Sequence, residues 1–200
     1  MNKYITELIG TMFLVLGAML GHAYGASLAL MVMIYAGGHI SGAHYNPAVT
    51  LAVWLRGRIE MKDMVMYWVF QLIGAALAAV LVMYVFDAGA KECIPVEMRT
   101  KATIAELLGT FALAYVVLNV ATAKGTAGNS FYGIAIAGTV LAMALTVGTY
   151  SGGAFNPAVA VGLCIDNSIC WSDIWIYLAG ALGGGYLASL IFDMNNPDDK

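Results

Sequence analysis

The sequence predicts an all-α membrane protein with six transmembrane helices and two half-helices. Of its 200 residues, 61% are hydrophobic and 10% are charged, whereas soluble domains carry about 25% charged residues. Polar breaks divide the chain into six apolar segments, and the motif Asn-Pro-Ala occurs twice between them. A chain of this size cannot hide so much apolar surface in a core of its own, so we expect a lipid bilayer to cover it.

The six apolar segments have the length of membrane-spanning helices. Each contains 16 to 23 residues, and a helix needs about 20 residues to cross the hydrocarbon core. None alternates polar and apolar residues, which argues against a membrane β-barrel. The first has no small-residue cleavage site before a polar region, so we interpret it as a retained helix rather than a signal peptide. The segments are 4–21, 23–38, 64–86, 102–122, 131–150 and 174–192.

The two Asn-Pro-Ala motifs are typical of helix starts. Asparagine is a good N-cap residue, and proline suits the first helical turn, where its missing N–H costs nothing. We therefore expect half-helices over residues 47–55 and 157–164, which are too short to span a membrane. Entering from opposite faces, they would meet N-terminus to N-terminus and point their positive dipole ends at one spot near the midplane. The motifs are Asn46-Pro47-Ala48 and Asn156-Pro157-Ala158.

The chain contains two similar halves. The stretch "ITELIGTMF" matches "IAELLGTFA", which aligns Glu7 with Glu106, and each half carries one Asn-Pro-Ala motif in a matching place. Each half holds three apolar segments, so the second half must be inverted in the membrane, as in many transport proteins. We expect a single channel domain over residues 1–200, with inverted repeats over about 1–90 and 100–195.

The basic residues favour a cytoplasmic N-terminus. In that orientation the inner side holds six lysines and arginines and the outer side holds three, which agrees with the positive-inside rule. We expect a multi-pass protein of the cell (inner) membrane with both termini in the cytoplasm. The inner residues are Lys3, Arg56, Arg58, Lys62, Lys124 and Lys200, and the outer ones are Lys91, Arg99 and Lys101.

These motifs resemble those of the aquaporin, or major intrinsic protein, family. The resemblance rests on the two Asn-Pro-Ala motifs, on "GGHISGAHYNPAVT" around the first, and on the paired "TELIGT" and "AELLGT"; it covers about residues 5–192. It implies an aquaporin-like fold in an inverted 3+3 repeat and a passive channel for water and small neutral solutes. It also implies a homotetramer in the lipid bilayer with a pore in each subunit, and no cofactor.

The resemblance also assigns roles by position. Asn46 and Asn156 would donate hydrogen bonds to water in single file, and the converging helix dipoles would hold protons back. Glu7 and Glu106 would brace the half-helix loops by accepting backbone N–H bonds, with a proton relay as the alternative role. The loop carbonyls would form two polar tracks, made by Gly42, Ala43, His44 and Tyr45 and by Gly152, Gly153, Ala154 and Phe155.

The outer selectivity ring departs from the family pattern. The family usually places arginine after the second Asn-Pro-Ala, and here that position is Val159. The other three ring positions, carried over by distance from the motifs, fall on Ala26, Ala144 and Gly153, where the family has bulkier residues. All four residues are small or apolar, so we expect a wide, apolar outer filter that admits solutes such as glycerol or urea.

Two other functions of a membrane protein are alternatives to the channel. A secondary transporter normally needs ionisable residues at its substrate site, and only Glu7 and Glu106 lie within apolar segments. A non-conducting structural protein of the same fold predicts a blocked pore. The chain shows no catalytic constellation, metal-ligand spacing or basic run, so we expect no enzyme activity, no metal and no nucleic-acid partner. Cys164 and Cys170 could pair on the outer face, but we expect free thiols.

Overall fold

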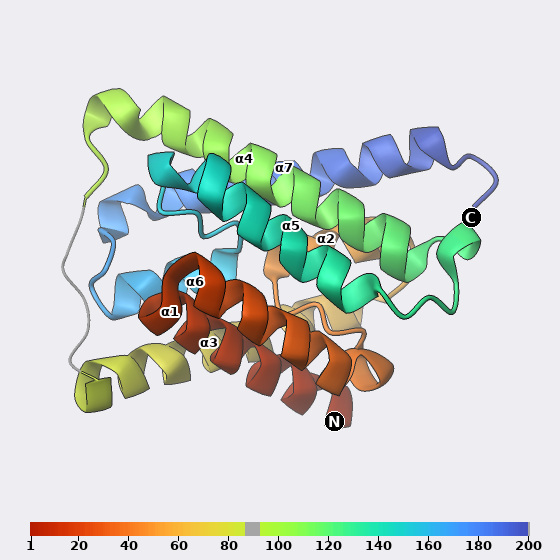
Figure 1. The fold of residues 1–200 in the computed structure, drawn as a ribbon, viewed down its shortest axis with the longest axis horizontal. Helices are drawn as coiled ribbons and strands as arrows, with labels where there is room; N and C mark the ends of the chain where they lie inside the picture. Colours follow the sequence, from red (N-terminus) through yellow and green to blue (C-terminus); the bar gives the residue numbers. More distant parts are fainter. Residues whose placement is uncertain (87–92, 200) are drawn as a thin grey trace.

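A computed structural model describes residues 1–86 and 93–199, and the regular elements among them are helical (Figure 1). The α-helices are α1 (Asn2–Ser41), α2 (Pro47–Leu55), α3 (Met61–Leu81), α4 (Arg99–Val117), α5 (Tyr132–Thr146), α6 (Pro157–Ile165) and α7 (Ile174–Asn195). The short helical turns are η1 (Val82–Phe86), η2 (Val96–Met98), η3 (Leu118–Thr122), η4 (Lys124–Thr126), η5 (Gly148–Tyr150) and η6 (Trp171–Asp173).

Helix α1 consists of two arms joined at a sharp kink. His22 has a φ of 49° and a ψ of −141°, and the chain doubles back on itself within α1 (Figure 1). Glycine allows the two arms to touch beside this kink, because a Cβ on Gly25 would lie only 2.3 Å from the carbonyl oxygen of Gly17. The two arms correspond to the predicted segments 4–21 and 23–38.

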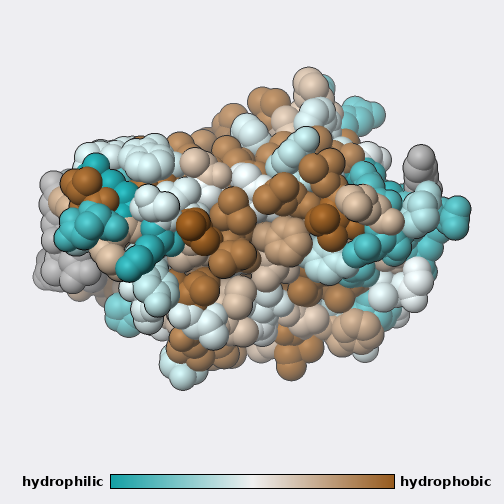
Figure 2. Space-filling model, turned by 90° about the horizontal axis from the view of Figure 1, so that it is seen from above, coloured by the Kyte–Doolittle hydropathy of each residue, from teal (hydrophilic) through white to brown (hydrophobic). Residues whose placement is uncertain are grey.

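The helices form a membrane-spanning bundle. Among the described residues, four helical stretches are long and apolar enough to cross a bilayer: Asn2–Ser41, Met61–Phe86, Val96–Thr122 and Trp171–Asn195. Helix α5 is apolar but shorter than the predicted segment 131–150, and at 1.5 Å per residue it is about 22 Å long; the turn η5 follows it. Figure 2 shows hydrophobic residues gathered over the middle of one face and hydrophilic residues at both ends, as a bilayer requires.

Glycines bring the long helices into backbone contact. A Cβ on Gly74 of α3 would lie 2.3 Å from the carbonyl oxygen of Leu8 in α1. A Cβ on Gly184 of α7 would lie 2.5 Å from the carbonyl oxygen of Leu107 in α4. Small residues at such crossings maximise packing where no hydrophobic effect drives helices together. The two glycines occupy matching positions in the two halves, because they have the same separation along the chain as the two motif asparagines.

The C-terminal tail is fastened to the loops beside it. Asp199 accepts the backbone N–H of Lys124 at 2.7 Å, and its other carboxylate oxygen lies 2.8 Å from Nη2 of Arg56. The bond from Lys124, together with the charge of Arg56, holds the pKa of Asp199 below its usual value of 3.8. Because both partners stabilise the charged carboxylate, the tail connects the end of α2 to the segment between α4 and α5 at neutral pH.

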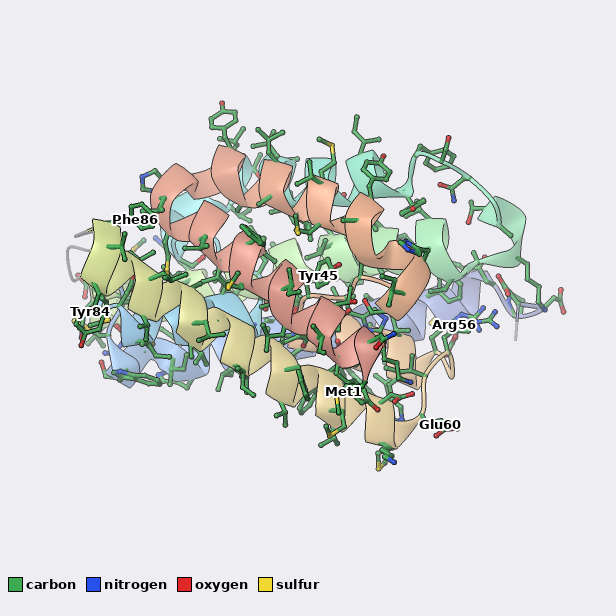
Figure 3. All side chains as sticks on the ribbon, turned by 90° about the horizontal axis from the view of Figure 1, so that it is seen from below. Met1, Tyr45, Arg56, Glu60, Tyr84 and Phe86 are labelled. Carbon is green, nitrogen blue, oxygen red and sulfur yellow. A yellow bond between two sulfur atoms is a disulfide. The ribbon has the colours of Figure 1, made fainter. Side chains whose placement is uncertain are left out.

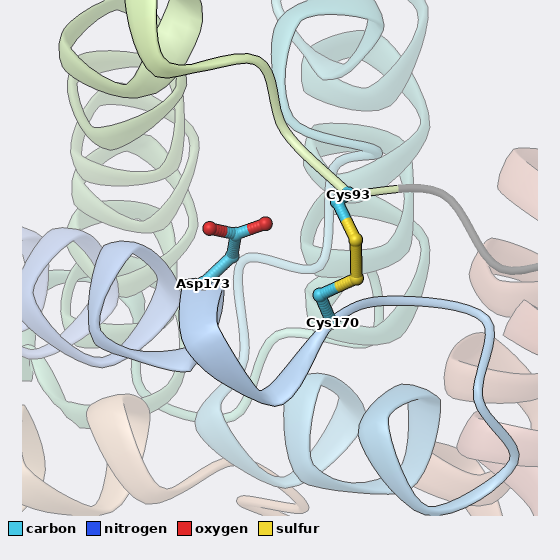
Figure 4. A group of neighbouring side chains, drawn as sticks. All are labelled: Cys93, Cys170 and Asp173. Carbon is cyan, nitrogen blue, oxygen red and sulfur yellow. A yellow bond between two sulfur atoms is a disulfide. The ribbon is translucent and has the colours of Figure 1, made fainter.

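A disulfide lies at the end of the molecule away from the C-terminal tail. Cys170 is bonded to Cys93, with their Cα atoms 5.1 Å apart (Figure 4). The expectation of a free thiol at Cys170 is therefore wrong, and so is its alternative pairing with Cys164, which is buried within α6 and unpaired. Asp173 reinforces the link, because it accepts the N–H of the residue after Cys93 at 2.8 Å and pairs with Arg99 at 2.9 Å.

The two ends of the bundle can therefore be named by what they hold. Met1, Arg56 and Glu60 lie toward the end that we call the tail end, and Tyr84 and Phe86 lie toward the opposite end (Figure 3). We call the opposite end the disulfide end, because α4 begins there (Figure 1) and Cys93 shortly precedes α4 in the chain. Two residues in the predicted charge bias, Lys91 and Lys200, lie outside the described residues.

Candidate functional site

The half-helices α2 and α6 meet at their N-termini. The side-chain oxygen of Asn46 accepts the backbone N–H two residues later at 2.8 Å, and that of Asn156 does the same at 2.9 Å. Each amide nitrogen then donates across to the opposite loop. Asn46 donates to the carbonyl of Phe155 and Asn156 donates to the carbonyl of Tyr45, both at 2.9 Å. These crossed bonds join two motifs that lie in different halves of the chain.

Each asparagine keeps one donor for a further partner. A side-chain amide carries two N–H groups, and the crossed bond uses one of them. Both asparagines line a common cavity. The positive ends of the α2 and α6 dipoles converge beside it, so the site offers hydrogen-bond donors and a positive potential but no carboxylate from the described residues.

Two buried carboxylates hold the loops that precede the asparagines. Glu7 accepts the backbone N–H of His44 at 2.9 Å and that of Tyr45 at 2.7 Å. Glu106 accepts the matching pair in the second loop, from Ala154 at 3.0 Å and from the next residue at 2.6 Å. Neither glutamate is exposed, and a carboxylate provides four acceptor positions for such bonds.

Side chains that the sequence analysis did not single out complete this support. The hydroxyl of Tyr67 donates to the carbonyl of Ser41 at 2.7 Å, and the hydroxyl of Tyr177 donates to that of Ser151 at 2.6 Å. The two tyrosines could have been paired from the sequence, because they have the same separation along the chain as the motif asparagines.

The hydrogen-bond donors around the two carboxylates differ at one position. Gln71 donates to Glu7 at 2.8 Å in the first half. The matching position in the second half, by the separation of the motif asparagines, is Ala181. An alanine has no side-chain donor, so Glu106 lacks this bond and depends more on its own loop.

The loops place two aromatic side chains in space left by glycines. Tyr45 and Phe155 adopt left-handed backbone conformations, with φ values of 48° and 47°, which non-glycine residues rarely adopt. Their rings are buried against α1 and α4. A Cβ on Gly10 would lie 2.1 Å from the ring of Tyr45, and a Cβ on Gly109 would lie 2.2 Å from that of Phe155.

Replacing Gly10 with alanine is expected to destabilise the protein by about 1–3 kcal/mol, because the added methyl would force the buried Tyr45 ring to move. The measurement is thermal unfolding of the purified protein in detergent. The control is Gly21→Ala, where an added Cβ meets no atom within 4 Å and helix propensity favours alanine. Equal melting temperatures for the two variants would contradict this packing account.

The cavity beside the asparagines is small and has two kinds of wall. About 40 Å³ of it is open to the centres of water molecules, and one water needs about 10–15 Å³ on that measure, so it holds about three. Its polar wall is formed by Asn46, Asn156 and loop residues. The loop residues are Ala43, His44, Gly153, Ala154 and Phe155. Its aliphatic wall contains the side chains of Leu14, Leu30, Leu113, Val117, Ile136 and Val140.

Most of the predicted pore residues fall on this cavity. Of the predicted ring, Ala26, Gly153 and Val159 line it, whereas Ala144 on α5 is not among its lining residues. No lysine or arginine from the described part of the chain lines it. Of the predicted carbonyl tracks, Gly42 lines a second cavity at the tail end, while Tyr45 and Gly152 line neither cavity.

The second cavity is a wider vestibule. It has about 780 Å³ open to water and is lined by polar and basic residues, among them Arg58, Lys124, Thr126 and Asn129. His44 and Val117 line both cavities. The vestibule therefore continues the path from the central cavity toward the tail end.

The aliphatic wall was missed by the sequence analysis, although a signal was present. Leu14 follows Glu7, and Leu113 follows Glu106, by the same interval of seven positions. This interval makes two helical turns, so the leucines share a helix face with the glutamates. The glutamates contact the loops that border the path. Residues on the same helix face as the glutamates are therefore expected to line that path.

Comparison with known proteins decides the family. The model of the major intrinsic protein family matches residues 1–192. The chain belongs to the major intrinsic protein family. This aquaporin-family chain is 34% identical to "Aquaporin NIP1-1" of Zea mays, over 98% of the chain and 77% of that protein. It is 30% identical to "Aquaporin NIP1-2" of Arabidopsis thaliana, over 100% of the chain and 76% of that protein.

A solved structure shares the fold. The chain superposes on the aquaglyceroporin from Plasmodium falciparum with a TM-score of 0.76 at 20% identity, covering 98% of this chain and 97% of that one. This aquaporin-family protein therefore has an aquaporin-like all-α fold and is an integral, multi-pass membrane protein. It is a passive channel for water and small neutral solutes, and it is not an enzyme.

Proposed function

We propose that this channel admits neutral solutes larger than water, such as glycerol and urea. The observation that supports the proposal is the lining near the disulfide end, where Ala26, Gly153 and Val159 stand in place of bulky or charged residues. The path between the asparagines and the loop carbonyls supplies hydrogen-bond partners for hydroxyl or amide groups. The aliphatic wall accommodates the carbon side of the solute.

Two properties of the lining act in opposite directions on such a solute. A valine at position 159 donates no hydrogen bond and carries no charge, so a solute recovers little of its lost hydration there. The same valine, together with an alanine and a glycine, leaves more room than an arginine would. Pore width and lining donors together set selectivity. We expect width to dominate, because Asn46 and Asn156 still offer donors further along the path.

The experiment is stopped-flow light scattering of proteoliposomes that contain the purified protein. Vesicles are shrunk with an impermeant solute to measure water permeability, and then with glycerol or urea to measure re-swelling. Water, glycerol and urea fluxes should all rise with protein dose above those of empty vesicles. Water flux without glycerol or urea flux would contradict the proposal and would mean that another part of the path excludes these solutes.

We further propose that Asn46 and Asn156 donate to the permeating molecule and that Glu7 and Glu106 support the loops. The crossed bonds and the buried carboxylates favour these roles. The inverted repeats over about 1–90 and 100–195 are proposed on the same basis, since paired contacts recur at matching positions of the two halves. A homotetramer is proposed as the assembly, and native mass spectrometry from detergent would test it.

We infer that the tail end faces the cytoplasm and the disulfide end faces outward across the cell membrane. Disulfides persist in oxidising compartments rather than in the cytosol, and the bond between Cys93 and Cys170 lies at the disulfide end. The basic residues Arg56, Arg58 and Lys124 lie at the opposite end, as the positive-inside rule requires. A Lys124→Cys variant should react with an impermeant maleimide only after the cells are permeabilised; labelling of intact cells would reverse the orientation.

A further inference from the structure

The central cavity and the vestibule meet at two side chains. Within the described part of the chain, His44 and Val117 are the residues that line both spaces. Each is 7% exposed, so protein surrounds both side chains almost completely. His44 comes from the first loop and Val117 from the last turn of α4, so the path passes between two separate elements at this level.

The two halves of the chain differ at these positions. His44 matches Ala154 by the separation that relates the two motif asparagines, and Val117 matches Ala18 by the separation that relates the two glutamates. Both alanines also line the central cavity. Toward the tail end these positions are therefore an imidazole ring and a branched side chain, at His44 and Val117. Toward the disulfide end the matching positions are two alanine methyl groups. Larger side chains therefore border the path at His44 and Val117 than at the matching positions toward the disulfide end.

The His44 ring is held in place. Its Nδ1 lies 3.2 Å from the hydroxyl of Thr50, and its edge packs on Tyr67 with ring centroids 5.1 Å apart. The Thr50 hydroxyl donates its single hydrogen to the carbonyl of Asn46 at 2.9 Å, so Nδ1 must be the donor to Thr50 and a neutral ring keeps the lone pair on Nε2. A Cβ on Gly42 would lie 3.2 Å from Nε2, which shows how little room the ring has to turn.

We propose that His44 and Val117, and not the ring around Val159, set the largest solute that this channel passes. This inference rests on the proposed function as a solute channel. Val117 limits the width, and Nε2 of His44 accepts a hydrogen bond from the solute as it leaves the asparagines. Selection then acts between the central cavity and the vestibule, while the disulfide end serves as an open entrance.

The test compares polyols of increasing length in proteoliposomes: glycerol, erythritol and xylitol. Val117→Ala should raise erythritol permeability by about tenfold, as expected when a steric misfit of about one methylene is relieved. Val117→Leu should lower glycerol permeability. The matched control is Val116→Ala, the same change one residue earlier on α4 at a position that lines neither cavity, and its permeabilities should equal those of the unmodified protein.

The outcomes separate this inference from the proposed function. Water permeability first confirms that each variant is folded and inserted. If the unmodified protein passes water alone, the proposed solute channel fails; the constriction is still supported if Val117→Ala, but not Val116→Ala, then admits glycerol. The constriction is overturned if Val117→Ala and Val117→Leu leave every solute flux unchanged. It is also overturned if Val159→Ala raises erythritol flux and Val117→Ala does not.

Discussion

Replacing Val159 with arginine is expected to reduce glycerol and urea permeability by about tenfold or more, and water permeability by less, because lining width and charge set selectivity in such pores. Val159 is 4% exposed and lines the central cavity with Ala26 and Gly153. An arginine there would fill space, donate several hydrogen bonds and add a positive charge. Water is small enough to pass beside the arginine side chain, whereas a polyol is larger and must also give up the water molecules bound to its hydroxyl groups.

The measurement is the ratio of glycerol to water permeability in proteoliposomes at equal protein dose. Val159→Leu serves as a control that adds bulk without charge or donors, and we expect it to lower the ratio less than arginine does. A Val159→Arg protein with an unchanged ratio would mean that residue 159 does not border the solute path, and would contradict the wide-filter proposal.

Replacing Glu106 with glutamine is expected to abolish solute flux and to lower thermal stability. The carboxylate accepts three bonds, from the hydroxyl of Ser151 at 2.6 Å and from the N–H groups of Ala154 and Phe155 at 3.0 and 2.6 Å. A glutamine has one acceptor oxygen, and its NH₂ group would face an N–H that it cannot bond. Each buried donor left without a partner costs about 1–3 kcal/mol.

The substitution is expected to affect the pore because the carbonyl of Phe155, in the same loop, accepts the crossed hydrogen bond from Asn46. Displacing the second loop removes that bond and disturbs the start of α6. Unfolding temperature and glycerol flux are measured together, with Glu97→Gln in the exposed turn η2 as the matched control. A stable Glu106→Gln protein with full glycerol flux would show that the loop needs no carboxylate.

Features that depend on local rules could be predicted from the sequence. The half-helices begin at Pro47 and Pro157 as expected, because an asparagine cap and a following proline encode a helix start within three residues. The long helices follow from apolar length alone. The paired contacts of Glu7 and Glu106 were implied by family resemblance, and the structure shows the bonds that such roles need.

Features that depend on contacts between distant segments could not be predicted in the same way. Cys93 pairs with Cys170 because the chain brings two loops together 77 residues apart, and spacing alone does not reveal a pairing. Ala144 was placed on the ring by its distance from the motifs, and this assignment stays a prediction. The end of α5 and the turn η5 lie between Ala144 and Asn156, so a count of residues alone does not fix its position relative to the path. The constriction proposed at His44 and Val117 likewise involves two elements that only the fold brings together.

Proton exclusion is the strictest requirement on such a path, and we expect this channel to meet it without an arginine in the described lining. The N-termini of α2 and α6 converge at Asn46 and Asn156. Their summed dipoles place positive potential on the path, where it repels a cation but not a neutral solute. We therefore expect protons to be excluded at the asparagines rather than at Val159.

Solute passage and proton exclusion can be measured together in one batch of proteoliposomes loaded with a pH-sensitive dye. An inward glycerol gradient and, separately, a pH gradient are imposed at several protein doses, with empty vesicles as the baseline. We expect glycerol re-swelling that rises with protein dose and proton flux that stays at the level of empty vesicles. Proton flux that rises with dose, or glycerol re-swelling no faster than in empty vesicles, would contradict a neutral-solute channel centred on the two asparagines.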